Sequence, residues 1–229
     1  MTIEYHEIIA RLYAYRMSLR LTQQKMTPLL GIAQSQYSKI ESGESIITYQ
    51  SLVQMYANHL EVDYLITGIH SPKSILNTLV EKCPETKRAK FLHLIAWSME
   101  IELAHSKVST EDFKPQIYYQ LEVTRQCLNT KRNIWNAIRD VNQISQAEMA
   151  KGLCISLNRY RKIEKAAAFP DAEILMHMYN FIKYPPSMFL SVGHECIENL
   201  NSFWACLDTT SQKEAEIFLK NGLEYIQNR

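Results

Sequence analysis

Two stretches of the chain, 123 positions apart, align with each other without a gap. One begins at Leu21 and the other at Ile144, and they agree at apolar and polar positions alike. A repeat that persists over about fifty residues predicts that one structural unit of roughly 125 residues is built twice. Positions that are identical in the two stretches are Gln23/Gln146, Met26/Met149, Leu30/Leu153, Ile32/Ile155, Tyr37/Tyr160, Lys39/Lys162, Ile40/Ile163 and Glu41/Glu164.

The first stretch, residues 21–43, has the pattern of two short helices joined by a tight turn. Thr22 is a favoured N-cap residue, so the first helix is expected to open at Gln23. Gly31 then interrupts the pattern, as a residue with positive φ does. Apolar residues recur at helical spacing on both sides of that glycine, namely Met26, Leu29, Leu30, Tyr37 and Ile40. Two helices joined in this way make a helix-turn-helix.

The details of this stretch resemble the lambda-repressor-like (Xre/Cro) helix-turn-helix family. The resemblance is carried by the Leu-Thr-Gln opening at 21–23, by Gly31 and by the SKIESG ending at 38–43. It implies an all-α DNA-binding domain of five helices, here residues 1–69. Two residues depart from the family pattern. Pro28 removes a backbone N–H inside the first helix, which we expect to be kinked or shortened, and Thr27 stands where the family usually has Ala.

The second helix of the first motif, about 33–41, is the expected recognition helix. It carries side chains that can hydrogen-bond base edges or phosphates, although such a face can also simply be solvated. The candidates are Gln34, Ser35, Gln36 and Lys39. The resemblance also implies a phosphate contact for Gln23, because a helix N-terminus favours an anion. The alternative is that Gln23 only helps to cap its own helix.

The second motif offers a different and more basic recognition helix at about 156–164. Its candidates are Leu157, Asn158, Arg159, Arg161 and Lys162. Gln146 opens the first helix of this motif, and for it the resemblance implies the same phosphate contact as for Gln23, with the same alternative of capping. Asn can pair with adenine, Arg with guanine, and Leu can contact a thymine methyl group. Residues 130–190 contain nine Lys and Arg and five Asp and Glu, a net charge of +4. This positive charge favours binding to a phosphate backbone. The two motifs therefore cannot read identical half-sites by identical contacts.

The second motif also departs further from the family pattern. Cys154 replaces the turn glycine, which costs about 1 kcal/mol if the positive φ is kept. Ala166, Ala167 and Ala168 replace the Ser-Gly-Glu loop of the first motif. Loss of DNA binding by one motif therefore stays open. The resemblance implies that two charged pairs, Arg16 with Glu41 and Arg139 with Glu164, are internal ion pairs and not DNA contacts.

The rest of the chain is predicted to be helical as well. Pro84 separates a helix that begins after Pro72 from a longer helix at about 85–105, and a further helix is expected at 113–129. At an offset of 126, the C-terminal tail repeats this hairpin loosely, so that Phe91 falls on Ile217. The predicted organisation is a helix-turn-helix domain at 1–69, a hairpin with linker helix at 70–129, a second such domain at 130–190 and a C-terminal hairpin at 191–229.

Several classes of function are disfavoured. No apolar run approaches the length of a membrane span, and the N-terminus is unlike a signal peptide. Five cysteines without a C-x-x-C pair indicate free thiols in a reducing cytosol. His194, Cys196 and Cys206 lack a standard zinc spacing, and no nucleophile motif or phosphate-binding glycine loop is present. We therefore expect a cytoplasmic protein that is not an enzyme and needs no cofactor or metal.

The leading hypothesis is a sequence-specific transcriptional regulator that binds double-stranded DNA. Both recognition helices would enter the major groove, so that one chain acts as a pseudo-dimer. The helical hairpins would join the two copies or form a homodimer. The alternative is a protein-interaction module, such as an antirepressor or a peptide-responsive regulator. A net charge of only +1 and the irregular second turn favour this alternative.

Overall fold

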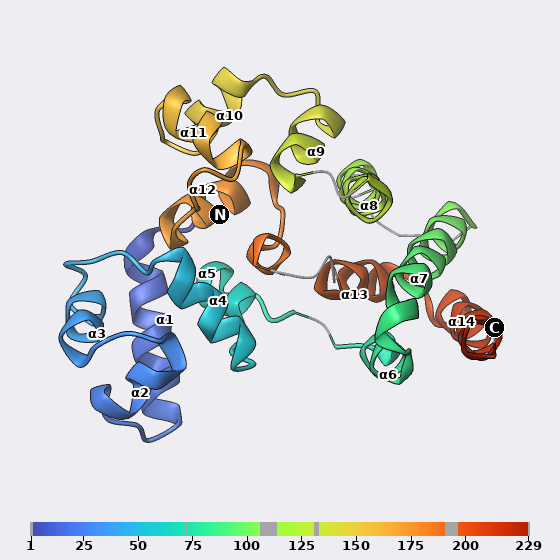
Figure 1. The fold of residues 1–229 in the computed structure, drawn as a ribbon, viewed down its shortest axis with the longest axis horizontal. Helices are drawn as coiled ribbons and strands as arrows, with labels where there is room; N and C mark the ends of the chain where they lie inside the picture. The colour runs from blue at the N-terminus through green and yellow to red at the C-terminus, as the bar shows by residue number, and fades with distance from the viewer. Residues whose placement is uncertain (1, 72, 106–113, 131–132, 191–196, 229) are drawn as a thin grey trace. The chain divides into compact units, whose positions relative to one another are not determined.

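The computed structural model describes residues 2–71, 73–105, 114–130, 133–190 and 197–228, and for parts of α8 and α13 it describes the backbone alone. Every described element is helical, as the sequence predicts, and no described helix is both long and apolar enough to cross a membrane. The elements are α1 (Tyr5–Ser18), α2 (Gln23–Leu30), α3 (Gln34–Glu41), α4 (Tyr49–Ala57), α5 (Val62–Thr67), α6 (Ile75–Lys82), α7 (Glu85–His105), α8 (Lys114–Thr130), α9 (Ile134–Val141), α10 (Gln146–Gly152), α11 (Leu157–Glu164), α12 (Ala172–Ile182), the 3-10 helix η1 (Pro186–Phe189), α13 (Ile197–Cys206) and α14 (Thr209–Gln227) (Figure 1).

The chain divides into two compact units, and each is built from two separate segments. The first unit contains Met1–His70 and Ser145–Leu190, and the second contains Ser71–Ile144 and Ser191–Arg229. Helix α9 packs against α8 and belongs to the second unit, whereas α10 to α12 belong to the first. The domain predicted at 130–190 thus spans parts of both units, and it stays a prediction.

Helix α2 continues through Pro28 to Leu30, so the proline does not end it. The Thr22 hydroxyl caps the helix by accepting from the Lys25 N–H at 3.3 Å, as expected. Without an N–H, Pro28 cannot donate to the carbonyl of Gln24, four residues earlier. The Thr27 hydroxyl donates to that same carbonyl at 2.9 Å. The two departures from the family pattern thus compensate each other, because one supplies the hydrogen bond that the other removes.

Three helix ends in the segment α1–α3 recur 123 residues later with the same backbone geometry. Gly31 has φ 67° and Cys154 has φ 56°, so the left-handed turn is kept without glycine. Both turns close with Schellman hydrogen bonds, from Ile32 N to Thr27 O at 3.3 Å and from Ile155 N to Ala150 O at 3.0 Å. The other left-handed pairs are Arg20 with Gln143 (φ 53° and 54°) and Gly43 with Ala166 (φ 81° and 54°).

Within the first unit, α5 packs against α12 and η1, and we call this contact the seam. Asp63 is 6% exposed, and its carboxylate accepts from the backbone N–H and the hydroxyl of Ser187 at 2.7 and 2.6 Å. The loop before α4 joins the seam because Ala172 N donates to Ile47 O at 3.0 Å. Further seam contacts are the stacked rings of Tyr49 and Phe169, the bond from Tyr49 Oη to Phe189 O, and two bonds between the Ile3 backbone and the Asn180 amide.

The second unit is a helical bundle in which the hairpin α6–α7 packs against α13–α14. The predicted offset of 126 aligns Phe91 with Ile217. Burial disagrees with this alignment, because Phe91 is fully buried in the core and Ile217 is 62% exposed. An offset of 124 agrees with burial instead. Pairs buried on both sides at this offset are Leu76/Leu200, Leu79/Phe203, Val80/Trp204, Cys83/Leu207, Phe91/Ala215, Ile95/Leu219 and Met99/Leu223.

Candidate nucleic-acid interface

The outer face of α3 carries the candidates of the first motif. Gln34, Ser35 and Lys39 are exposed, and Gln36 is half-buried. Tyr37 and Ile40 on the opposite face are fully buried and fix the helix against its domain. The face is polar and carries one cation, so it offers hydrogen bonds to bases more than attraction to phosphates.

A buried carboxylate, that of Glu41, lies at the C-terminal end of α3. It pairs with Arg16, whose Nε and Nη2 donate at 2.8 and 3.1 Å, and the two side chains are only 7% and 10% exposed. The predicted internal ion pair is therefore confirmed. Burial opposes ionisation of Glu41, but hydrogen bonds from Arg16 and Gln23 outweigh it and lower the pKa of this carboxyl. The hydrogen bond with Glu41 raises the pKa of the Arg16 guanidinium.

Gln23 links the two ends of α3, because it contacts both Glu41 and Gln34. Its Nε2 donates to Glu41 at 2.6 Å, and its Oε1 accepts from Gln34 Nε2 at 3.4 Å. Thr22 supplies the cap, so Gln23 is not needed for capping. Because the amide is held through one N–H, its second N–H can still point to an anion.

The second motif repeats this arrangement with one change. Gln146 Nε2 donates to Glu164, which also accepts from the Tyr160 hydroxyl at 3.4 Å. The Oε1 of Gln146 accepts from Arg161 Nε at 3.1 Å. In the first motif the corresponding oxygen, Oε1 of Gln23, accepts from Gln34. Arg139 forms an ion pair with Asp140 at 3.1 Å, and its expected pair with Glu164 stays a prediction.

The outer face of α11 is strongly basic. Asn158, Arg159, Arg161 and Lys162 are exposed, and Leu157 is half-buried. Arg159 Nη2 lies 2.8 Å from Oδ2 of Asp171, the N-cap residue of α12. Sequence reasoning missed Asp171. Its alignment with the N-cap Thr48 could have predicted a cap, but the ion pair depends on the three-dimensional turn between α11 and α12.

The left-handed turn at Cys154 gives a first testable prediction. Cys154→Gly should stabilise the protein by about 0.5 kcal/mol, because relief of the positive-φ strain slightly exceeds the entropy that glycine gains on unfolding. Gly31→Ala should destabilise it by about 1 kcal/mol through the reverse change. An added Cβ at Gly31 would also lie 3.3 Å from Cγ of Gln54. Urea unfolding followed by circular dichroism measures both changes.

Cys154→Ala serves as the control, since it removes the thiol and keeps the strained backbone. It should leave the free energy of unfolding near that of the unaltered protein. Destabilisation by Cys154→Gly would contradict the assignment of strain to this turn.

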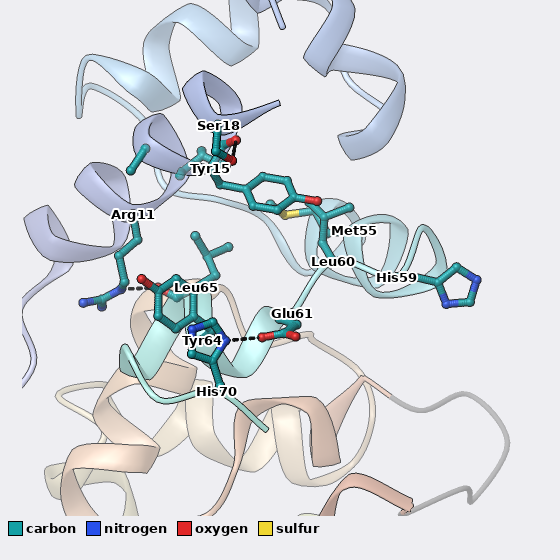
Figure 2. Close-up of a pocket in the computed structure, with 12 residues that line it drawn as sticks. Arg11, Tyr15, Ser18, Met55, His59, Leu60, Glu61, Tyr64, Leu65 and His70 are labelled. Atoms are coloured by element: carbon teal, nitrogen blue, oxygen red, sulfur yellow. Dashed lines mark hydrogen bonds and ion pairs between the residues drawn. The ribbon is translucent and has the colours of Figure 1, made fainter. Parts of the chain in front are cut away.

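A cavity of about 530 Å³ opens between α1 and the α4–α5 junction, and its lining includes no residue of α3 or α11 (Figure 2). Its walls include Tyr15 and the stacked rings of Tyr64 and His70, whose centroids lie 4.0 Å apart. His70 Nδ1 also lies 2.5 Å from Glu61 Oε2. Such a volume can hold a small molecule, and none of the candidate DNA-binding residues lines it.

The described residues contain no cluster of three or more His, Cys, Asp or Glu side chains suited to a metal ion. His194 and Cys196 lie outside the described residues. Burial raises the pKa of the Cys206 thiol, which disfavours the thiolate that zinc needs. Cys83, Cys127, Cys154 and Cys206 are thiols and not disulfides.

Comparison with known proteins agrees with this geometry for one part of the chain. Residues 12–62 match the model of a family described as helix-turn-helix. The matched range contains all of α2, α3 and α4. No curated protein and no solved structure matches the chain. The first segment is thus a helix-turn-helix domain, and the other elements that the structure describes are helical too.

Proposed function

We propose that the protein is a sequence-specific DNA-binding transcriptional regulator of the cytoplasm, and that one chain presents two helix-turn-helix motifs to double-stranded DNA. The observation that carries this proposal is the exposed face of α11, with its two arginines and one lysine, in the same compact unit as the matched helix-turn-helix domain. In this proposal the chain contains an internal duplication, supported by the recurring helix ends and by the Gln-to-Glu hydrogen bond in both motifs.

The seam supports a pseudo-dimer. In a two-fold arrangement, residue i of one copy contacts residue j of the other, and j contacts i. At an offset of 123, Ile47 corresponds to Pro170 and Ala172 to Tyr49. The bond between Ile47 and Ala172 therefore has a near counterpart in the stacking of Tyr49 on Phe169. The seam would hold the two recognition helices as one rigid pair.

The two recognition helices have separable effects in a selection experiment with random double-stranded DNA. Arg159→Ala should lower discrimination at one base pair by about 5- to 150-fold, as expected for loss of an arginine–guanine contact. Gln36→Ala should alter preference within the other half-site. Gln23→Ala should weaken binding to all sequences alike, because it removes a phosphate contact. Unchanged preference and affinity in all three variants would contradict DNA recognition by these helices.

The stoichiometry of the same complexes separates a pseudo-dimer from a homodimer. A pseudo-dimer binds as one chain per two half-sites. A homodimer through the hairpins would bind as two chains, and its contact surface would include the exposed apolar side chains of α7 and α14. Those side chains are Trp97, Ile217, Phe218 and Tyr225. We favour one chain, because the seam already joins two motifs within it.

The cavity on α1 and α5 adds a structural observation in favour of the alternative, a protein-interaction module such as an antirepressor or a peptide-responsive regulator. Salt dependence distinguishes the two functions. DNA binding that uses phosphate contacts weakens steeply as salt rises, whereas a protein-interaction module shows no selective DNA binding at any salt concentration.

A further inference from the structure

The two carboxylate oxygens of Asp171 accept hydrogen bonds from different partners. Oδ1 accepts from the backbone N–H of Ile174 at 3.0 Å and so caps α12. Oδ2 accepts from Arg159 Nη2 at 2.8 Å. The arginine side chain is 49% exposed and the aspartate 21%, so the acid is the better anchored partner.

Two features fix the position of Asp171. A carboxylate at a helix N-terminus is favoured by the unpaired N–H groups and the helix dipole. The next residue, Ala172, is buried and donates to Ile47 O across the seam. A long arginine side chain normally loses much rotamer freedom when it contacts a base. Attachment to a fixed carboxylate removes part of that freedom before DNA arrives.

We propose that Asp171 is a positioning residue, which holds the guanidinium of Arg159 in place to read one guanine in the major groove; this inference rests on the proposed function. Arg159 has five N–H donors, and the carboxylate engages one of them. The remaining donors suffice for the paired hydrogen bonds to O6 and N7 of guanine. Asp171 thus acts through Arg159 and does not itself contact a base.

The first motif lacks this device. Gln36 stands at the position of Arg159 and Thr48 at that of Asp171. Thr48 caps α4 with its hydroxyl, which accepts from the Ser51 N–H at 3.2 Å, and it carries no charge. The guanine preference set by this pair therefore belongs to the half-site of the second motif alone.

Asp171→Asn tests the proposal, because asparagine caps a helix as well as aspartate but forms no ion pair. The measurements are binding of the selected DNA site, of the same site with that guanine replaced, and of unrelated DNA. We expect the preference for guanine to fall about fivefold, the contribution of one exposed ion pair. Binding of unrelated DNA should not weaken, since a negative charge near the phosphates is lost. Glu173→Gln, the same charge change two residues further along α12, should alter binding of the three DNAs equally.

A double variant separates positioning from a general charge effect. In an Arg159→Ala background, Asp171→Asn should leave the preference for guanine unchanged. An equal loss of preference with and without Arg159, or no loss in Asp171→Asn alone, would overturn the inference while the proposed function stands. If the unaltered chain selects no DNA sequence, the proposed function fails, and the inference fails with it.

Discussion

Moving the two half-sites of the selected DNA apart by five base pairs should weaken binding of the chain at least about 100-fold. Five base pairs are about half a turn of DNA, so the second half-site rotates to the opposite face of the duplex. Only one motif can then bind, and the gain from linking two binding events is lost. The expected optimum places the half-site centres about 10 base pairs apart. Competition binding with a series of spacer lengths measures this dependence.

The spacer with ten added base pairs decides between a rigid and a flexible connection. It returns the second half-site to the original face but moves it about 34 Å further along the axis. The seam cannot extend by that distance while Asp63 stays bonded to Ser187 and Ile47 to Ala172. Binding should therefore stay weak, equal to that of DNA with a single half-site. Recovery of full affinity at this spacing would show that the motifs are independently tethered.

Glu41→Gln should destabilise the first unit by about 3 kcal/mol, because it leaves the Arg16 guanidinium buried without a carboxylate. The folded pKa of Glu41 is lowered, so its contribution to stability is present above the unfolded pKa. That contribution is lost as the pH falls through the lower folded pKa. The unaltered protein should therefore lose stability on acidification, and Glu41→Gln should lose less. Urea unfolding at pH 7 and at pH 3 measures both effects.

Two further variants control this experiment. Glu44→Gln neutralises an exposed carboxylate near the same helix end and should change stability by less than about 0.5 kcal/mol. Arg16→Met combined with Glu41→Leu removes both charges and should recover much of the loss, since a well-packed apolar pair can replace a buried ion pair. Hydrogen exchange should locate the loss in α1 to α3. A Glu41→Gln protein as stable as Glu44→Gln would contradict a structural role for the pair.

The motif boundaries were predictable because they follow from local chemistry. Thr22 and Thr48 are side-chain caps, and Gly31 has the positive φ that its place in the pattern requires. The pair of Arg16 and Glu41 came from the family resemblance and is confirmed by contact. The compensation of Pro28 by Thr27 does not follow from either residue alone. The hydrogen bond from the Thr27 hydroxyl to the Gln24 carbonyl becomes evident only when every backbone acceptor is assigned a donor.

Contacts between residues distant in the sequence were harder to predict from the sequence. The pairing of Arg159 with Asp171 depends on the path of the loop between α11 and α12, which composition does not specify. The hairpin offset of 126, which rests on single matches such as Lys87 with Lys213, differs by two residues from the offset that burial supports. Matching buried positions instead, such as Leu76 with Leu200, gives the offset that the core supports. Cys154 adopts the left-handed conformation although it is not glycine, so the lack of a glycine does not exclude such a turn.

The discontinuity of the two units has a consequence for folding. The first unit is complete only when Ser145–Leu190 follows Met1–His70, and the second only when Ser191–Arg229 follows Ser71–Ile144. During synthesis, Asp63 must therefore wait for more than half of the chain before Ser187 can donate to it. Contacts between residues so distant in sequence close large loops and form late. The first helix-turn-helix domain would emerge from the ribosome early, and the coupling of the two motifs would be among the last features to form.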